Sequence, residues 1–322
     1  MDGPIAVYSI GADLGGTKVS AALIDDDGIV LRSSYLPHDG TIEGAIQSIV
    51  TVVGDFADAS PQPTRVGVAA AGLIDRKNGD LVDSALLGVK TFPLGRHLAA
   101  LLQMNVIVEN DANATLLGVH PSCAGTDTAI LIALGTGVGG AVSIGGRLVE
   151  GANGFAAEIG HIAVEQPGRH PCPCGSSGCL ELFASGTAVA AAAARRGQHE
   201  MNGARWSAVD VVGAAAQGDA LALQILEEAG TAVGQALVGL IAAFDPAVVY
   251  ISGGFGHAAA PYLLPAIADR VRAQRSFPAA RPLPEIIADP VGPLAAAIGA
   301  ARLAQRDQTT TTTVHERCSN EL

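Results

Sequence analysis

The segment that decides the fold is IAVYSIGADLGGTKVSAA, Ile5–Ala22, which predicts a buried strand, a glycine-rich turn and a second strand. Ala129–Ile144, AILIALGTGVGGAVSI, predicts the same three parts again. A pattern that returns later in a chain is a sign of internal duplication. Predicted helices such as Thr41–Ala57, Leu182–Arg196 and Leu221–Phe244 alternate with further strands such as Arg65–Ala69, so the sequence indicates an α/β protein. Gly72–Asp83 contains turn residues.

Three glycine-rich turns, each after a predicted strand, are candidates for binding phosphate groups. They are DLGGTK at Asp13–Lys18, LGTGVGG at Leu134–Gly140 and SGGF at Ser252–Phe255. Glycines let backbone N–H groups close around phosphate oxygens, and Asp13 could hold Mg²⁺ through water, since this cation prefers oxygen ligands. The first turn, Asp13–Lys18, has neither the Walker spacing nor G-x-G-x-x-G.

Taken alone, each turn is equally compatible with a plain hairpin or a helix entry. The three together, in this order, favour a nucleotide site. Its candidate residues are Asp13, Gly15, Gly16, Thr17, Lys18, Gly135, Thr136, Gly137, Gly139, Gly253 and Gly254.

A cysteine cluster indicates a metal site. Cys172, Cys174 and Cys179 form a C-x-C-x₄-C motif, and His161 precedes it by eleven residues. Three thiolates and one imidazole are a tetrahedral set that Zn²⁺ takes in closed structural sites. His170 is the alternative fourth ligand. A redox role is the competing interpretation, but the motif lacks C-x-x-C spacing.

Composition excludes several classes of protein. The chain has 322 residues and five cysteines, an odd number with three clustered, which disfavours a disulfide framework. A net charge of −12 makes nucleic acid a poor partner. The start of the chain lacks the basic region of a secretory signal. The chain also has no run of about 18 apolar residues without a charge, so no membrane span is predicted. We therefore expect a cytoplasmic protein that binds neither membrane nor nucleic acid.

Acceptor-rich side chains are candidates for a ligand with several hydroxyl groups. Asn110 and Asp111 end a predicted apolar strand, where α/β proteins place their sites. Glu158 precedes His161 by three residues, and Glu181 follows the cysteine motif. Any one of these acids could be a solvated charge or a helix cap, but the set tied to the metal loop favours function.

These motifs together resemble the repressor–open-reading-frame–kinase (ROK) family of bacterial sugar kinases and regulators. The resemblance runs from about Ile5 to Gln305 and rests on Asp13–Lys18, Glu109–Asp111, Leu134–Gly140, Glu158–His161 and Cys172–Glu181. It implies an α/β fold of the two-domain actin–hexokinase (ribonuclease H-like) type with a central cleft. The implied domains are 1–120, joined by a C-terminal helix at 293–306, and 121–292 with the zinc loop. Residues 307–322 are expected to be a disordered tail.

The resemblance also implies roles for individual residues. Asp111 resembles the general base, and His161, Cys172, Cys174 and Cys179 resemble the ligands of a structural zinc. Sugar hydroxyls would be bound by Gly72, Asn110, Asp111, Glu158, His161 and Glu181. ATP with Mg²⁺ would lie at the first two glycine turns, with adenine near Gly253 and Gly254.

The expected activity is ATP-dependent phosphorylation of O6 of a hexose, glucose above others. A strand that begins at Ile5 leaves no space for the helix-turn-helix domain of the family's regulators, which favours the kinase branch. Glu181–Thr187 is similar to glucokinase members, whereas Ser84–Val89 replaces the Asn and Trp that many of them carry. The alternatives are N-acetylglucosamine, N-acetylmannosamine, fructose or allose as substrate, or a sugar sensor without activity. Similar members are homodimers or homotetramers.

Overall fold

The computed structural model describes residues 7–317, except for 59–61, 85–86, 121–126, 166–169, 197–204 and 275–281. Cys123, Cys318 and residue 121, where the second domain was predicted to begin, lie outside these residues. The chain forms two compact units. The first comprises Met1–Pro121, Ala152–Gly154 and Pro293–Leu322, and the second comprises Ser122–Gly151 and Phe155–Gly292.

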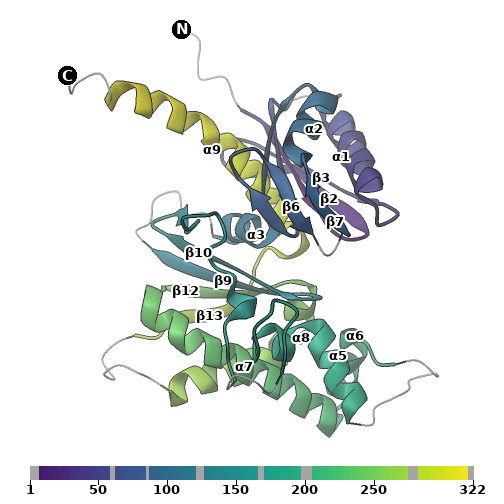
Figure 1. Ribbon diagram of the computed structural model, residues 1–322, viewed down its shortest axis with the longest axis vertical. Coiled ribbons are helices and arrows are strands. Elements are labelled where there is room, and N and C mark those ends of the chain that lie inside the picture. The colour runs from purple at the N-terminus through teal and green to yellow at the C-terminus, as the bar shows by residue number, and fades with distance from the viewer. Residues whose placement is uncertain are drawn as a thin grey trace. The chain divides into compact units, whose positions relative to one another are not determined.

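The first unit is built on a five-stranded sheet of order β3-β2-β1-β4-β8 (Figure 1). Its strands are β1 (Ser9–Leu14), β2 (Lys18–Ile24), β3 (Val30–Pro37), β4 (Arg65–Ala70) and β8 (Asn105–Asn110). A small sheet contains β5 (Leu73–Asp75), β6 (Asp80–Ser84) and β7 (Val89–Phe92), and the helices are α1 (Ile42–Ala57), α2 (Leu94–Leu102), α3 (Asp111–Val119) and α9 (Ala295–Arg317). The helix α9 begins after a short 3-10 turn, η2 (Gly292–Leu294).

The second unit repeats this sheet, with the order β11-β10-β9-β12-β13. Its strands are β9 (Thr128–Leu134), β10 (Val138–Ile144), β11 (Arg147–Leu148), β12 (Val248–Ser252) and β13 (Glu285–Ala288). The helices are η1 (Ile159–His161), α4 (Glu181–Ala184), α5 (Gly186–Arg195), α6 (Ala208–Ala216), α7 (Ala220–Phe244) and α8 (Gly254–Ala273).

The two sheets share one connectivity. In each, the first strand pairs antiparallel with the next strand in sequence and parallel with the fourth, as β1 does with β2 and β4 and β9 does with β10 and β12. The internal duplication inferred from the glycine turns is therefore confirmed, as is the α/β fold.

The helix α7 has a long apolar sequence but belongs to the core of the second unit. It is the single helix, among the described residues, whose length and composition would also suit a membrane span, and 56% of its most apolar window is buried. Ile225, Val233 and Leu237 pack in the core that the sheet and α8 share. Such burial is typical of a core helix of a globular protein.

The helix α9 lies against the sheet of the first unit through small residues. An added Cβ at Gly11 of β1 would lie 1.7 Å from the carbonyl oxygen of Ala297, and one at Gly67 of β4 would lie 1.9 Å from that of Ala300. Backbones in such close contact leave no space for a side chain. The helix is assigned as far as Arg317, past residue 306, where its end was predicted. A run of threonines is a poor helix former, which is why the sequence favoured an earlier end.

We expect Gly67→Ala to lower the free energy of unfolding by about 3 kcal/mol or more, because the methyl group must displace backbone atoms of α9. Gly54→Ala in α1 is the matched control. Its Cβ would meet nothing within 4 Å, and alanine at a helical glycine stabilises by about 0.5–1 kcal/mol. Urea denaturation of both variants measures the difference, and equal stabilities would contradict the close contact.

Candidate active site

The first glycine turn joins β1 to β2. The Gly15 N–H donates to the carbonyl oxygen of Lys18 over 3.1 Å, which closes the turn. Asp13 is the penultimate residue of β1, and burial together with the nearby charge of Asp111 raises its pKa to about 7, although Lys18 acts in the opposite direction. A divalent cation at this carboxylate would favour its ionised form. Lys18 itself holds its Nζ over the ring of Tyr35, 5.5 Å from the ring centre.

Asn110 and Asp111 lie where β8 passes into α3. The Asn110 Oδ1 caps the helix by accepting from the N–H groups of Ala112 (2.9 Å) and Asn113 (3.2 Å), and its Nδ2 donates to the carbonyl oxygen of Gly72 over 3.1 Å. An amide has two N–H donors, so Asn110 keeps one for a ligand. Gly72 adopts φ +132°, and a Cβ there would lie 2.2 Å from the carbonyl oxygen of Asp83.

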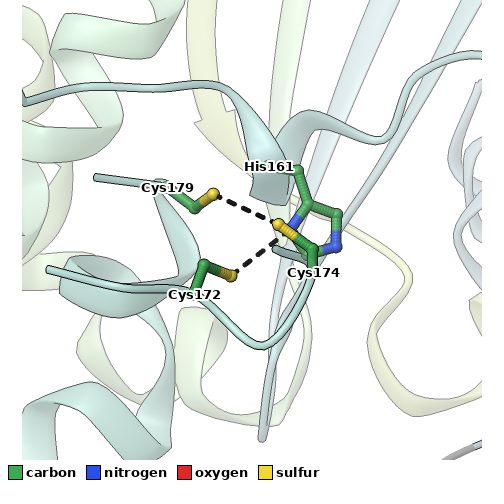
Figure 2. A group of neighbouring side chains, drawn as sticks. All are labelled: His161, Cys172, Cys174 and Cys179. Atoms are coloured by element: carbon green, nitrogen blue, oxygen red, sulfur yellow. Dashed lines mark hydrogen bonds between the residues drawn. The ribbon is translucent and has the colours of Figure 1, made fainter. Parts of the chain in front are cut away.

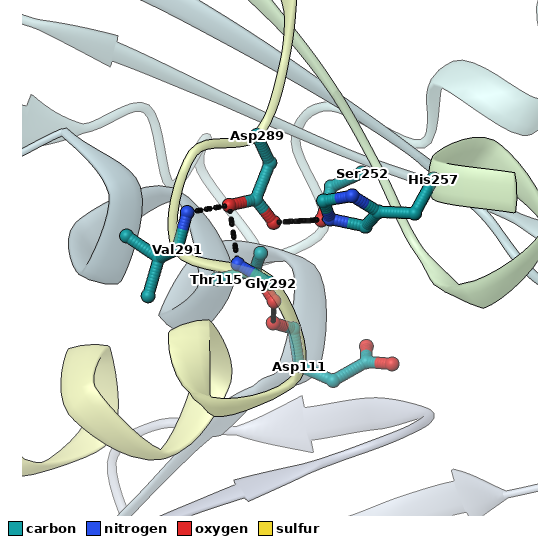
Figure 3. A network of polar contacts seen from close by, with 7 residues as sticks. All are labelled: Asp111, Thr115, Ser252, His257, Asp289, Val291 and Gly292. Carbon is teal, nitrogen blue, oxygen red and sulfur yellow. Dashed lines mark hydrogen bonds and ion pairs between the residues drawn. The ribbon is translucent and has the colours of Figure 1, made fainter. Parts of the chain in front are cut away.

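Asp111 is the first residue of α3. Its Oδ1 accepts from the N–H of Ala112 over 2.9 Å, and its carbonyl oxygen accepts from the Thr115 hydroxyl over 2.7 Å (Figure 3). These bonds fix the backbone from which the carboxylate projects. Asp111 also lies close enough to Asp13 to raise the pKa of that residue. The first unit therefore brings together four of the residues predicted from its sequence: Asp13, Gly72, Asn110 and Asp111.

Glu109, the residue before Asn110, is a buried carboxylate that hydrogen-bonds to Asn110 and Asn113. The sequence had not identified this role. Glu109 is 1% exposed. Its Oε1 accepts from the Asn110 N–H (2.9 Å) and from Asn113 Nδ2 (3.1 Å), and its Oε2 pairs with Arg76 Nη2 over 2.8 Å. A charged residue at the end of an otherwise apolar strand is the signal that indicates such a buried pair. Nothing in the sequence near Arg76 identifies it as the partner.

Removal of Glu109 is expected to be strongly destabilising. Glu109→Ala removes the buried carboxylate that pairs with the Arg76 guanidinium, and breaking such a pair costs about 3–5 kcal/mol. The control is Asp80→Ala, which removes the partner of Arg96, a residue whose side chain is 71% exposed; exposed pairs are worth about 0–1 kcal/mol. Thermal unfolding compares the variants, and a small effect at Glu109 would show that the pair is not structural.

The second glycine turn joins β9 to β10. The Gly135 N–H donates to the carbonyl oxygen of Gly137 over 3.0 Å. Glu181, the first residue of α4, accepts from the Val138 N–H through Oε2 over 3.0 Å, and a Cβ at Gly137 would lie only 2.5 Å from that oxygen. A side chain at 137 would therefore displace the Glu181 carboxylate from this position.

Glu158, His161 and Glu181 lie together in the second unit. Glu158 precedes η1 and His161 ends it. Burial raises the pKa of Glu158, the proximity of His161 lowers it and the charge of Glu181 raises it further. The pattern predicted Glu158 and His161 on one helical turn, and the turn is of the 3-10 type. Two carboxylate acceptors beside an imidazole suit a hydroxyl-bearing ligand.

The cysteine motif and His161 converge on one point (Figure 2). The ligand atoms of His161, Cys172, Cys174 and Cys179 all lie within 4.8 Å of one another. The Cys172 Sγ lies 3.9 Å from His161 Nδ1, and the Sγ atoms of Cys174 and Cys179 are 3.7 Å apart. His170 is engaged elsewhere, with Nδ1 2.6 Å from Glu165 Oε2 and its ring edge-on to Phe183.

The electrostatics of this cluster suit a cation. Burial, followed by the neighbouring thiols, raises the pKa of Cys179 to about 12, whereas the Ser176 backbone N–H lowers the pKa of the exposed Cys174. Thiolates gathered in so small a volume repel one another, and a bound metal ion removes that cost. The donor set and its spacing therefore fit Zn²⁺.

The third glycine turn leads from β12 into α8. Gly253 has φ +85°, and a Cβ there would lie 2.4 Å from the carbonyl oxygen of Leu134. Beside it, the buried Asp289 accepts from the Ser252 hydroxyl (2.6 Å), lies 3.2 Å from His257 Nε2 and accepts from the N–H groups of Val291 and Gly292 (Figure 3). This network ties the turn to the segment that follows β13.

Two sheets of the same connectivity, each with a glycine turn after its first strand, define a protein of the actin–hexokinase fold. The chain belongs to the ROK family, whose family model matches residues 9–307. The family membership inferred from the motifs is therefore confirmed.

The matched parts of three similar proteins cover between 77% and 92% of this chain. A glucokinase of Streptomyces coelicolor is 32% identical over 315 residues, which is 92% of this chain and 97% of that protein. A glucokinase of Thermotoga maritima is 36% identical over 77% of this chain and 82% of its own length. An N-acetylmannosamine kinase of Escherichia coli is 32% identical over 77% of this chain and 83% of its own length.

Among solved structures, this chain is similar to a ROK family glucokinase from Streptomyces griseus in complex with glucose and AMPPNP. The TM-score is 0.79 at 32% identity, with 93% of this chain and 99% of that chain covered.

Proposed function

We propose that this protein is an ATP-dependent hexose kinase that transfers the γ-phosphoryl group to O6 of glucose. The observation that carries the proposal is the position of Asp111, at the head of α3 and close enough to Asp13 of the first glycine turn to raise its pKa. A carboxylate beside a phosphate-binding turn is where a kinase needs its base. Full-length similarity to glucokinases supports glucose as the substrate.

Asp111 would act as general base in this reaction. A carboxylate with an ordinary pKa of about 4 is too weak to deprotonate an alcohol in advance. It suffices because the transition state of phosphoryl transfer is loose, so the O6 proton leaves late. Asp111 accepts that proton as O6 attacks the γ-phosphorus, and the bond to the ADP oxygen breaks.

The remaining predicted residues would bind and orient the substrates. Asn110 has one N–H left for a sugar hydroxyl, and the carboxylates of Glu158 and Glu181 would accept from others. With Nδ1 on the metal, His161 would donate through its Nε2–H. Backbone N–H groups of the glycine turns would bind phosphate oxygens. Asp13 would hold Mg²⁺, which neutralises charge on the phosphates when it is bound.

The cluster of His161, Cys172, Cys174 and Cys179 would bind one structural zinc. Four protein ligands leave no open position on the ion, so its contribution is to order the loop between His161 and Glu181. The Nδ1 of His161 faces Cys172. Its Nε2 is therefore free of the metal and could contact a sugar hydroxyl.

The oligomer and the compartment form a separate proposal. We expect a homodimer or homotetramer, as in similar family members, located in the cytoplasm. The net charge of −12 makes nucleic acid a poor partner. Analytical ultracentrifugation tests the oligomeric state, and a monomer at micromolar concentration would contradict it.

The substrate is tested by ADP release from MgATP with glucose, mannose, fructose, N-acetylglucosamine, N-acetylmannosamine and allose. We expect kcat/KM for glucose to exceed that of every other sugar. The relative from Escherichia coli makes N-acetylmannosamine the second candidate, and a higher kcat/KM for that sugar would replace glucose in the proposal. ADP release with none of the sugars, in zinc-replete protein that binds ATP, would favour a sugar sensor.

A further inference from the structure

His38, which follows β3, holds the backbone of the first glycine turn from outside. Its Nε2 lies 2.9 Å from the carbonyl oxygen of Gly15, and its Nδ1 lies 3.1 Å from the backbone nitrogen of Gly40. The main-chain N–H of His38 donates to the carbonyl oxygen of Thr17 over 2.9 Å. One residue therefore bonds to both ends of the turn.

The contacts of the ring define its tautomer. A backbone N–H can only donate, so Nδ1 of His38 accepts from Gly40. In a neutral imidazole the other nitrogen then carries the proton. The Nε2–H of His38 consequently donates to the carbonyl oxygen of Gly15.

This bond sets the direction of an N–H group that could bind phosphate. The carbonyl of Gly15 and the N–H of Gly16 belong to one trans peptide unit and point in opposite directions. With the carbonyl held by His38, the Gly16 N–H faces away from the imidazole, and within the described residues it has no hydrogen-bond partner. Glycines on both sides of the peptide would otherwise let it rotate and present an oxygen to the phosphate.

The second glycine turn is held in the same manner, within its own unit. The Thr187 hydroxyl donates to the carbonyl oxygen of Thr136 over 2.8 Å, and the Gly186 N–H donates to that of Gly135 over 2.8 Å. By the same geometry, the N–H groups of Thr136 and Gly137 face away from α5. In both turns, therefore, backbone carbonyl oxygens accept hydrogen bonds from residues that lie outside the turn.

We propose that His38 and Thr187 are positioning residues that fix the peptide planes of the two glycine turns, so that the N–H groups of these turns face the phosphates of ATP. The proposal rests on the kinase function proposed above. Neither side chain needs to contact the nucleotide, because each acts through one backbone carbonyl.

The test is the affinity for nucleotide, measured as Kd for MgADP by calorimetry and as KM for MgATP. His38→Leu removes the donor, and we expect both constants to rise about tenfold, the effect of one hydrogen bond. His38→Gln keeps an N–H at the place of Nε2, so we expect constants within about threefold of the wild type. His97→Leu, which removes an exposed histidine packed edge-on against Phe92, is the control.

Thr187 is tested by an isosteric pair. Thr187→Val removes the hydroxyl with little change of shape, and we expect a rise of Kd for MgADP similar to that of His38→Leu. Thr187→Ser retains the hydroxyl and should restore wild-type affinity. KM for glucose should stay within about twofold in all four variants, because the peptide planes concerned face phosphate.

The outcomes separate this proposal from the function on which it rests. Wild-type Kd values in His38→Leu and Thr187→Val would overturn the positioning role and leave the kinase intact. Equal losses of affinity for nucleotide and sugar, with a lower Tm, would overturn it in favour of a general structural role. Absence of nucleotide binding by the wild type would overturn the kinase proposal and this one together.

Discussion

Asp111→Asn is expected to lower kcat by about 10²–10⁴-fold, the contribution of a general base. Asparagine has nearly the same shape but cannot accept the O6 proton. KM for glucose should change little, because the amide oxygen can still accept from a sugar hydroxyl. Steady-state ADP release at saturating glucose measures the effect.

Two controls accompany this variant. Asp269→Asn alters an exposed carboxylate paired with Arg272 and should leave kcat unchanged. The Tm of Asp111→Asn should match the wild type or exceed it, since repulsion by Asp111 adds to the effect of desolvation in raising the pKa of the half-buried Asp13. Near-normal turnover by Asp111→Asn would remove the residue from the role of base.

Cys179→Ser is expected to abolish zinc binding and to impair folding of the loop that precedes Glu181. The Cys179 side chain is fully buried, and its Sγ is one of four converging ligand atoms. Because the free energy of binding a structural zinc is also folding free energy, we expect a Tm lower by about 10 °C. Displacement of Glu181 and His161 should lower kcat/KM by about tenfold or more.

Elemental analysis and thermal unfolding measure these effects, with about one zinc per wild-type chain expected. Cys318→Ser is the control, since Cys318 lies outside the cysteine motif and outside the described residues. Removal of zinc from the wild type with a chelator should reproduce the variant. A wild type without zinc that retains its Tm and activity would contradict a structural metal.

The sequence predicted the elements that carry strong periodicity. The helix expected at Thr41–Ala57 is α1 at Ile42–Ala57, with Thr41 as its N-cap. The strand expected at Arg65–Ala69 is β4 at Arg65–Ala70. The helix is buried on one face and the strand on both, and this burial decides where apolar residues occur. The sequence therefore predicts both elements directly.

Other elements left weaker signals. The segment Gly72–Asp83 contains turn residues, yet it forms β5 and most of β6, because a short strand in a small sheet needs few apolar residues. The helix expected at Leu182–Arg196 is divided into α4 and α5 at Ser185, whose hydroxyl caps α5 by accepting from the Ala188 N–H. A serine within a helical pattern does not by itself reveal a cap.

For the candidate site, the motifs indicated which residues matter but not how they are held. The sequence brought Asn110 and Asp111 together because they are adjacent. It did not show that Asn110 donates one N–H to the carbonyl oxygen of Gly72, or that Glu109 forms an ion pair with Arg76. Such contacts depend on the pairing of β4 with β8 and on the turn after β5, which long-range packing determines.

The central claim is tested most directly by identifying the products of the zinc-replete protein incubated with MgATP and glucose. Phosphorus and carbon NMR should show ADP and glucose 6-phosphate formed in equal amounts, with no ADP in the absence of sugar. Formation of ADP without a phosphorylated sugar, or of a glucose phosphate substituted at another oxygen, would contradict the account.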